Sequence, residues 1–356
     1  MSPLEVTLTH ISRILSFKTD QLSLKQDIIN HVFNWESIIS EGSRQLVIPT
    51  LYSRLKSKDL LQYLPQDLQH YLAYIFDLNK ERNNALLQEV KLISSWFKTK
   101  NIEHVYLKGA AMIASNYYED IGERMIGDID ILIPRAQCQQ AFDVLIDNGY
   151  TYAKEPTISP KYFEDKHLLR LASKDYIGAV EIHFKLLDKD QKALHPVHVL
   201  ENKQFIEITN IPIPSVKHLL IHNVLNFQIN DFGSFYNFIG LKNFYDTLVL
   251  LPHLELDDEK ELFKNRHLKN NFNLGRLYFN DIPKPPTSLR LTYNTKVYLL
   301  KNKYQNFGFW HYKILSYIKL LKLVLHRTWF FLVNRNYRKD VLNDRQRIKD
   351  FIKSKL

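Results

Sequence analysis

The stretch GDIDILI, residues 127–133, decides the fold. Side chains on a β-strand alternate between two faces, so Asp128 and Asp130 project together from one face while the isoleucines enter the core. Two neighbouring carboxylates repel each other unless a cation neutralises them, and Mg²⁺ is a hard ion that prefers carboxylate oxygens. A strand with one polar face produces the same spacing by chance, so this stretch alone leaves both interpretations open.

The segments on either side favour a site for phosphate chemistry. Upstream, Lys108 and Gly109 precede a run of small residues at a predicted strand-to-helix turn, where backbone N–H groups can receive a phosphate. Downstream, the predicted strand 178–186 directs Glu181 and His183 to the face opposite its apolar residues. Three carboxylates on two strands can hold two metal ions about 3.5–4 Å apart.

The whole chain reads as a mixed α/β core between helical regions, an α+β fold. Residues 4–98 have helical periodicity, and residues 215–227, after the N-cap Ser215, and 235–251 resume it. The segments between them predict strands at 102–107, 128–134 and 178–186 and helices at 110–118 and 137–150. The expected domains are a helical region 1–98, an α/β core 99–210, a helical domain 211–285 and a basic helical tail domain 286–356.

Composition excludes several classes of protein. The 356 residues are 45% apolar and 24% charged, which is typical of a globular chain with a full core and not of a disordered one. A single cysteine, Cys138, excludes an internal disulfide and a multi-cysteine metal site. The N-terminus has no signal-peptide pattern, so we expect a cytoplasmic protein.

The net charge of +10 is concentrated at the C-terminus. Residues 287–356 contain sixteen Lys and Arg against three Asp, which makes this segment +13 and the other 286 residues −3. Clustered positive charge predicts contact with an anionic polymer, RNA or a membrane surface, so the protein is expected to be cytoplasmic or peripheral to the membrane.

Within this basic segment, residues 314–333 are predicted to form an amphipathic helix with too many cations to span a bilayer. We expect its apolar face to pack against the helical body, and an anionic membrane interface is the alternative. That face comprises Ile314, Ile318, Leu321, Leu325 and Leu332.

Three segments together resemble a known family. LKGAAM (107–112), RMIGDIDILI (124–133) and EIHF (181–184) are similar in order and spacing to an uncharacterised nucleotidyltransferase family of the polymerase-beta-like superfamily. The resemblance covers roughly residues 45–250, where His222 and Asp246 look like the helical His and Asp positions of the family. The basic tail lies outside it. The resemblance implies a nucleotidyltransferase fold whose central mixed sheet binds Mg²⁺, with an NTP as the donor substrate.

The same resemblance implies roles for single residues. Asp128 and Asp130 would be metal ligands beside the triphosphate, and Glu181 would occupy the third acidic position and help the metal deprotonate the acceptor. Gly109 would lie under the phosphates. The sequence departs from the superfamily where Lys-Gly-Ala replaces the usual Gly-Ser entry, nineteen positions before Asp128. The remaining candidates for nucleotide or phosphate contact are Lys108, Arg124 and His183.

Several alternatives remain open at this point. Arg124 can contact a phosphate or pair with the acidic cluster, and His183 can touch the nucleotide, orient Glu181 or be a structural histidine. His218 and His222 share one helix face, but no accompanying pattern favours a metal pair over a structural role. The chain as a whole can also be a non-catalytic scaffold that binds a nucleotide or polyanion, or a toxin that modifies tRNA by nucleotidyl transfer.

Overall fold

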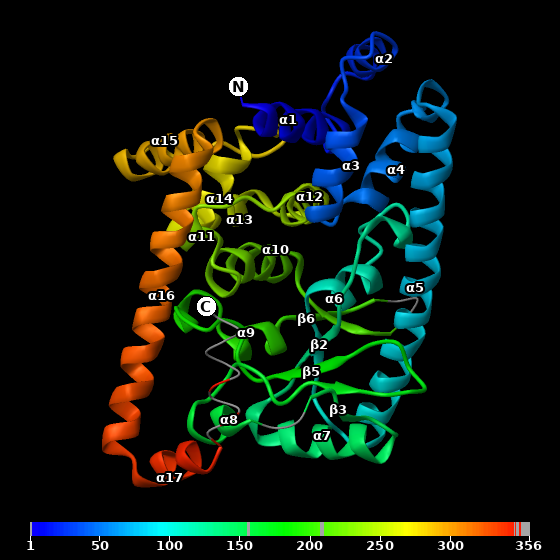
Figure 1. The fold of residues 1–356 in the computed structure, drawn as a ribbon. Coiled ribbons are helices and arrows are strands. Elements are labelled where there is room, and N and C mark those ends of the chain that lie inside the picture. The colour runs from blue at the N-terminus through cyan, green and yellow to red at the C-terminus, as the bar shows by residue number, and fades with distance from the viewer. Residues whose placement is uncertain (1, 155–156, 207–209, 345, 347–348, 350–356) are drawn as a thin grey trace.

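Helical regions flank a small mixed sheet, as predicted. The computed structural model describes residues 2–154, 157–206, 210–344, 346 and 349. The long helix α5 runs along one edge of the molecule and the long helix α16 along the opposite edge, with the sheet and helices α10 to α14 between them (Figure 1). The expected mixed α+β fold is confirmed.

The N-terminal region forms five helices. The first of them starts with a capping box, in which Ser2 and Glu5 each accept a hydrogen bond from the other's backbone N–H, and has Pro3 at its first position. The helical periodicity predicted for residues 4–98 is confirmed at the end of α5, where Leu86, Val90, Ile93 and Phe97 form one fully buried apolar stripe. The helices are α1 (Pro3–Leu15), α2 (Gln21–Ile29), α3 (Trp35–Arg44), α4 (Ile48–Ser57) and α5 (Gln66–Thr99).

The central sheet has five strands in the order β1-β2-β5-β4-β3. The pair β2–β5 is parallel, whereas β1–β2, β4–β5 and β3–β4 are antiparallel. Three strands fall where the sequence predicts them, but β3 and β4 are two residues long each and carry no periodic signal. The strands are β1 (Val105–Tyr106), β2 (Ile129–Leu132), β3 (Thr151–Tyr152), β4 (Leu171–Ala172) and β5 (Val180–His183).

The connections between these strands differ in part from expectation. The predicted helix 110–118 is the shorter α6 (Lys108–Ala114), which ends before Asn116 adopts a left-handed conformation with φ 59°. The predicted helix 137–150 is α7 (Cys138–Asp147), and it ends at Gly149 with φ 87°, as its sequence indicates. The other elements of this region are α8 (Ile158–Tyr162), α9 (Pro196–Glu201) and the two-stranded sheet β6 (Lys203–Phe205) and β7 (Pro212–Pro214).

The region after β7 is helical. Ser215 caps α10 (Val216–Leu225) by accepting a hydrogen bond from the backbone N–H of His218, as predicted. The expectation of one helix over 235–251 is wrong, because Asn237 adopts φ 56° and separates α11 (Gly233–Tyr236) from α12 (Leu241–Leu250). Two further helices complete this region, α13 (Leu256–Leu262) and α14 (Arg266–Gly275). The proposed domain boundaries near 99, 210 and 285 stay a prediction.

The basic tail forms three helices up to Asn343 in the part that the structure describes, and its expected packing is wrong. They are α15 (Leu289–Lys303), α16 (Gln305–Val333) and α17 (Arg335–Asn343). No residue of α16 is buried, and the apolar face expected to pack against the helical body is exposed. No helix among the described residues is long and apolar enough to cross a membrane. The predicted cationic end of the tail, residues 345, 347–348 and 350–356, lies outside the described residues.

The entry to β5 gives a test of this packing. An added Cβ at Gly178 would lie 2.6 Å from Cδ1 of Ile129 in β2 and 2.9 Å from both carboxylate oxygens of Glu89 in α5. We expect Gly178→Ala to lower the free energy of unfolding by about 1–3 kcal/mol through overpacking, measured by urea denaturation. At Gly127 an added Cβ meets nothing within 4 Å, so Gly127→Ala is the matched control and should not destabilise. Equal stability of the two variants would contradict this packing.

Candidate functional site

The acidic residues meet on the parallel strand pair β2–β5. The register places Asp130 directly opposite Glu181 and Leu132 opposite His183. Ile129 and Ile131 enter the core with 1% and 0% exposure, as strand alternation predicts. Asp128 lies just before β2 and is half-buried. The three carboxylates predicted from the sequence therefore come from neighbouring positions in space.

Asp130 is a buried carboxylate with two cationic neighbours. Its Oδ1 lies 2.6 Å from Nζ of Lys108 and 2.7 Å from Nε2 of His183, and its side chain is 1% exposed. Burial pushes the pKa of Asp130 upward, but the Lys108 ammonium and the His183 ring outweigh it and hold that pKa well below its usual range. A buried carboxylate needs such partners, since an unpaired charge in the interior is costly.

Glu181 is held by two histidines. Its Oε2 lies 3.6 Å from Nε2 of His183 and 3.7 Å from Nε2 of His167, which stands opposite His183 through an isolated β-bridge. Burial lowers the pKa of His183, but its hydrogen bonds to Asp130 and Glu181 raise it overall. Asp130, Glu181 and His183 each have one atom that could bind a metal ion, and these three atoms lie within 4.8 Å of one another. His183 thus contacts both carboxylates, and its predicted orienting role toward Glu181 agrees with this geometry.

Asp128 stands at the solvent side of the cluster. Its Oδ2 lies 3.6 Å from a guanidinium nitrogen of Arg170, which precedes β4. Burial, followed by the negative charges of Asp130 and Glu181, raises the pKa of Asp128. The carboxylate of Asp128 is thus both partly removed from water and close to two further negative charges, which Lys108 and Arg170 only partly offset. A bound cation would relieve this repulsion.

Helix α5 fixes the irregular segment that leads into β2. Nδ2 of Asn79 donates to the backbone carbonyls of Gly122 and Arg124, and Nδ2 of Asn83 donates to those of Ile121 and Arg124. Arg82, the residue before Asn83 in α5, donates to the backbone carbonyl of Ile126 at 2.7 Å. These side chains satisfy carbonyl groups that have no strand or helix partner, and they thereby position the residues just before Asp128.

The turn into α6 brings Lys108 to the cluster. Lys108 adopts φ 46°, a left-handed conformation that is uncommon for a residue with a Cβ. An added Cβ at Gly109 would lie 2.7 Å from both Nη1 of Arg124 and Cγ2 of Ile126. Gly109 is therefore required in this structure by the close approach of Arg124. Its predicted position beneath the phosphates stays a prediction, as does the phosphate contact of Lys108.

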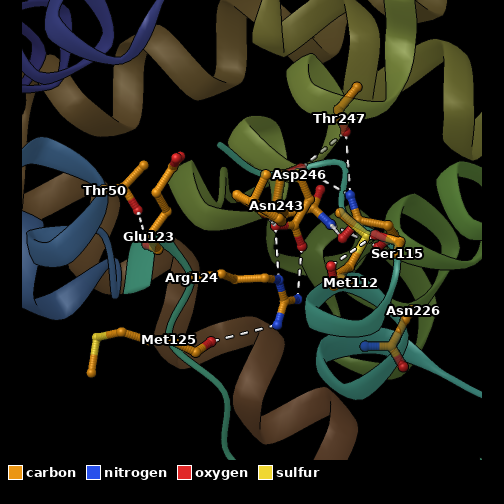
Figure 2. A network of polar contacts seen from close by, with 12 residues as sticks. Thr50, Met112, Ser115, Glu123, Arg124, Met125, Asn226, Asn243, Asp246 and Thr247 are labelled. Atoms are coloured by element: carbon orange, nitrogen blue, oxygen red, sulfur yellow. Dashed lines mark hydrogen bonds and ion pairs between the residues drawn. The ribbon is translucent and has the colours of Figure 1, made fainter. Parts of the chain in front are cut away.

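Arg124 forms a buried ion pair, but with a different partner from the acidic cluster. Its Nε lies 2.9 Å from Oδ1 of Asp246 and its Nη2 lies 2.8 Å from Oδ2, a two-point contact with α12 (Figure 2). Tyr118 donates a further hydrogen bond to Oδ1 of Asp246. Burial alone would lower the pKa of Arg124, but Asp246 and Tyr118 raise it. The ion pair joins the sheet region to the helical region, and a contact between Arg124 and a phosphate stays a prediction.

A cavity of about 230 Å³ opens between the acidic strand and the helical region. A hollow of about 560 Å³ beside α15 is larger, but its only acidic lining residue is Glu5, so we place the site at the smaller cavity. The lining residues on the sheet side include Lys108, Gly109, Arg124, Asp128 and Asp130. Those on the helical side include His222, Asn223, Asn226, Asp231, Lys242, Asn243 and Asp246.

Lys242 is the lining residue that sequence reasoning missed and that bears most on function. It is the second residue of α12, and its side chain has no hydrogen bond or ion pair with any described residue. Burial, with a smaller contribution from Arg124, lowers the pKa of Lys242. His222, which the resemblance singled out, is neutral because burial lowers its pKa to about 3. No sequence signal identifies Lys242, since its neighbours in space are distant in the chain.

The residues present fit a divalent metal ion. Both side-chain contacts of Asp130 among the described residues fall on Oδ1, and a carboxylate oxygen of Glu181 lies within 4.8 Å of one from Asp130. Asp128 lines the same cavity as Asp130 but is not part of this close group. Mg²⁺ prefers oxygen ligands, so Asp128, Asp130 and Glu181 would hold it, and the nitrogen of His183 would orient the carboxylates. The predicted ligand set is therefore compatible with the geometry, and its occupancy stays a prediction.

Comparison with known proteins agrees with this site. A family described as uncharacterised nucleotidyltransferase matches residues 31–274. The match includes the acidic strands, Lys108 and the helices that close the cavity, and it ends before the basic tail. No curated protein matches the sequence.

The ion pair between Arg124 and Asp246 gives a test of how the cavity is closed. Replacing Asp246 by Asn leaves a buried guanidinium without its counter-charge, so we expect Asp246→Asn to lower the free energy of unfolding by about 3–5 kcal/mol. Urea denaturation would measure the loss. Glu261→Gln, which removes one partner of the surface ion pair with Lys217, is the control and should leave stability unchanged. A similar small effect for both variants would show that the buried pair does not hold the two regions together.

Proposed function

Because the chain belongs to the uncharacterised nucleotidyltransferase family, we propose that it transfers a nucleoside monophosphate from an NTP to an acceptor. The acceptor hydroxyl or phosphate attacks the α-phosphorus, the bond to the bridging oxygen breaks, and pyrophosphate leaves. Membership in the family supports nucleotidyl transfer as the general reaction class. The NTP, the metal and the acceptor are parts of the proposal.

The observation that carries the proposal is the pairing of Asp130 with Glu181 on β2 and β5. Asp128 and Asp130 line one wall of the cavity and Glu181 lies beside Asp130, while Lys108 and Lys242 supply positive charge at the same cavity. A metal-bound triphosphate has both kinds of charge. A site that binds it needs carboxylates toward the metal and cations toward the phosphates.

The protein residues then have distinct tasks. Asp128, Asp130 and Glu181 would hold the cation, and Glu181, as the third acidic residue, would help the metal to deprotonate the acceptor. His183 keeps Asp130 and Glu181 in place through its contact with each. The chemistry that Mg²⁺, expected as two ions, supplies when bound is activation of the attacking oxygen and neutralisation of charge on the phosphates. Lys108 and Lys242 stabilise the negative charge that grows on the leaving pyrophosphate.

The first test replaces the two aspartates. Asp128→Asn with Asp130→Asn removes two of the three carboxylates, so we expect Mg²⁺-dependent NTP turnover to fall to background. The experiment incubates the protein with each labelled NTP, Mg²⁺ and a cell extract, and then identifies the labelled acceptor and measures pyrophosphate release. The double variant Asp143→Asn, Asp147→Asn on the exposed face of α7 controls for loss of charge and should be fully active.

The outcomes separate an enzyme from a scaffold. Unchanged turnover in a folded Asp128, Asp130 double variant would remove the catalytic assignment. Calorimetric titration of the unmodified protein with NTP, with and without Mg²⁺, completes the test. Binding that ignores Mg²⁺ and releases no pyrophosphate would favour a non-catalytic nucleotide-binding protein.

The second test addresses Lys242. Methionine has a similar length but no charge, so we expect Lys242→Met to raise the KM for NTP about tenfold or more, since a hydrogen bond to a charged group contributes about 1.5–3 kcal/mol. Steady-state kinetics on the acceptor found above would measure it. Lys91→Met on α5, whose side chain does not line the cavity, is the control. An unchanged KM for Lys242→Met would show that the cavity wall at α12 does not contact the triphosphate.

A further inference from the structure

Helix α16 carries an apolar face that no described part of the chain covers. At 100° per residue, seven of its exposed apolar side chains fall within one third of the helix circumference, while Phe309 and Val333, which are similarly exposed, lie outside that third. Each of the seven is 56–65% exposed, and monomeric proteins rarely expose such a continuous apolar patch to water. The helix is 29 residues long, so the stripe extends over about 40 Å. The side chains are Trp310, Ile314, Tyr317, Leu321, Leu325, Trp329 and Leu332.

The opposite edge of α16 is attached to the body, which fixes the direction of the apolar stripe. Near its N-terminal half, Tyr312 packs on Tyr236 with ring centroids 5.1 Å apart, and Nζ of Lys319 lies 3.3 Å from the ring centre of Phe232. Near its C-terminal end, Arg327 donates to Ser159 at 2.9 Å. All three α16 side chains lie on the face opposite the stripe. Because α16 runs along one edge of the molecule (Figure 1), the stripe, which lies opposite these contacts by helical rotation, faces away from the body.

The charge around this stripe has one sign. Between Asp281 and Asp340 the chain contains twelve Lys and Arg and no Asp or Glu. By helical rotation, Lys313 and Lys322 lie on the two flanks of the stripe, and both are exposed. A surface with an apolar centre, aromatic residues and cationic flanks is complementary to one that is apolar inside and anionic at its boundary.

We propose that α16 docks the protein onto an anionic lipid surface, with the helix lying in the plane of the headgroups. The leucine and isoleucine side chains enter the acyl boundary, Trp310 and Trp329 lie at the interface, and the lysines contact lipid phosphates. Because α5 lies at the opposite edge of the molecule, this orientation directs that edge away from the membrane (Figure 1). The inference does not depend on the proposed enzymatic activity.

The charge pattern favours a lipid over a second copy of the chain. Helices that pair through an apolar seam usually place acidic and basic residues beside it, so that the flanks attract each other. Two copies of α16 would bring lysines against lysines in either orientation, since the helix has no acidic residue. A nucleic acid would satisfy the lysines but leave the leucines in water.

The test is a sedimentation assay, which measures how much of the full-length protein binds to lipid vesicles. We expect binding to vesicles of 70% phosphatidylcholine and 30% phosphatidylglycerol. We also expect at least about tenfold weaker binding to phosphatidylcholine alone, and a blue shift of tryptophan emission on binding. Leu321→Gln with Leu325→Gln should weaken binding to the anionic vesicles at least about tenfold. Lys313→Gln with Lys322→Gln should weaken it roughly 30-fold. Because all four side chains are exposed, these variants should melt at the same temperature as the unmodified protein.

A control and three outcomes decide the matter. Leu22→Gln with Ile29→Gln replaces two residues of α2 that are 69% and 50% exposed, and it should bind the anionic vesicles as the unmodified protein does. The proposal is overturned if binding is absent or equally strong on neutral vesicles. It is overturned in favour of a polyanion such as RNA if the lysine variant loses binding while the leucine variant keeps it. It is overturned in favour of a second copy if light scattering shows a dimer that the leucine variant dissociates and that binds no vesicles.

Discussion

The parallel pairing of β2 with β5 is the interaction on which the site depends. It sets Asp130 opposite Glu181, and a shift of one residue would turn one of these carboxylates into the apolar core. Burial of Asp130 then requires cationic partners, and the contacts with Lys108 and His183 meet this requirement. The entry to each strand is fixed by α5, through Arg82 before β2 and Glu89 before β5.

The two walls of the cavity depend on each other. The sheet side alone would leave Arg124 as a charge without a partner, and the helical side alone would leave Asp246 in the same state. Their buried two-point contact therefore couples formation of the cavity to folding of both regions. This coupling also fixes the position of Lys242. One turn of α12 separates Lys242 from Asp246, so both residues line the same wall. The family match covers both walls, which is consistent with one cooperative unit.

The sequence predicted those parts of the site that obey a local period. Alternation was sufficient to direct Asp128 and Asp130 away from the core on one strand and Glu181 with His183 away from it on the next, because this period does not depend on the rest of the fold. The partners that arrive through tertiary contacts carried no such signal. Arg170 and His167 depend on the register of strands only two residues long, and the fold of the helical region alone brings Lys242 to the cavity.

In the basic tail too, the sequence predicts a local element but not its tertiary contacts. A helical period reveals that α16 has an apolar face, but it cannot say which way the face points, since an inward and an outward orientation share one pattern. Contacts on the opposite edge decide it: Lys319 lies over Phe232 and Arg327 over Phe163, so the cations that interrupt the apolar sequence hold the helix to the body. The expectation of inward packing failed because these cations, and not the leucines, hold the helix to the body. Because aromatic rings of the body bind these cations, the leucines form the outer surface of α16. An apolar surface of this size is typical of a site that binds a partner or a membrane.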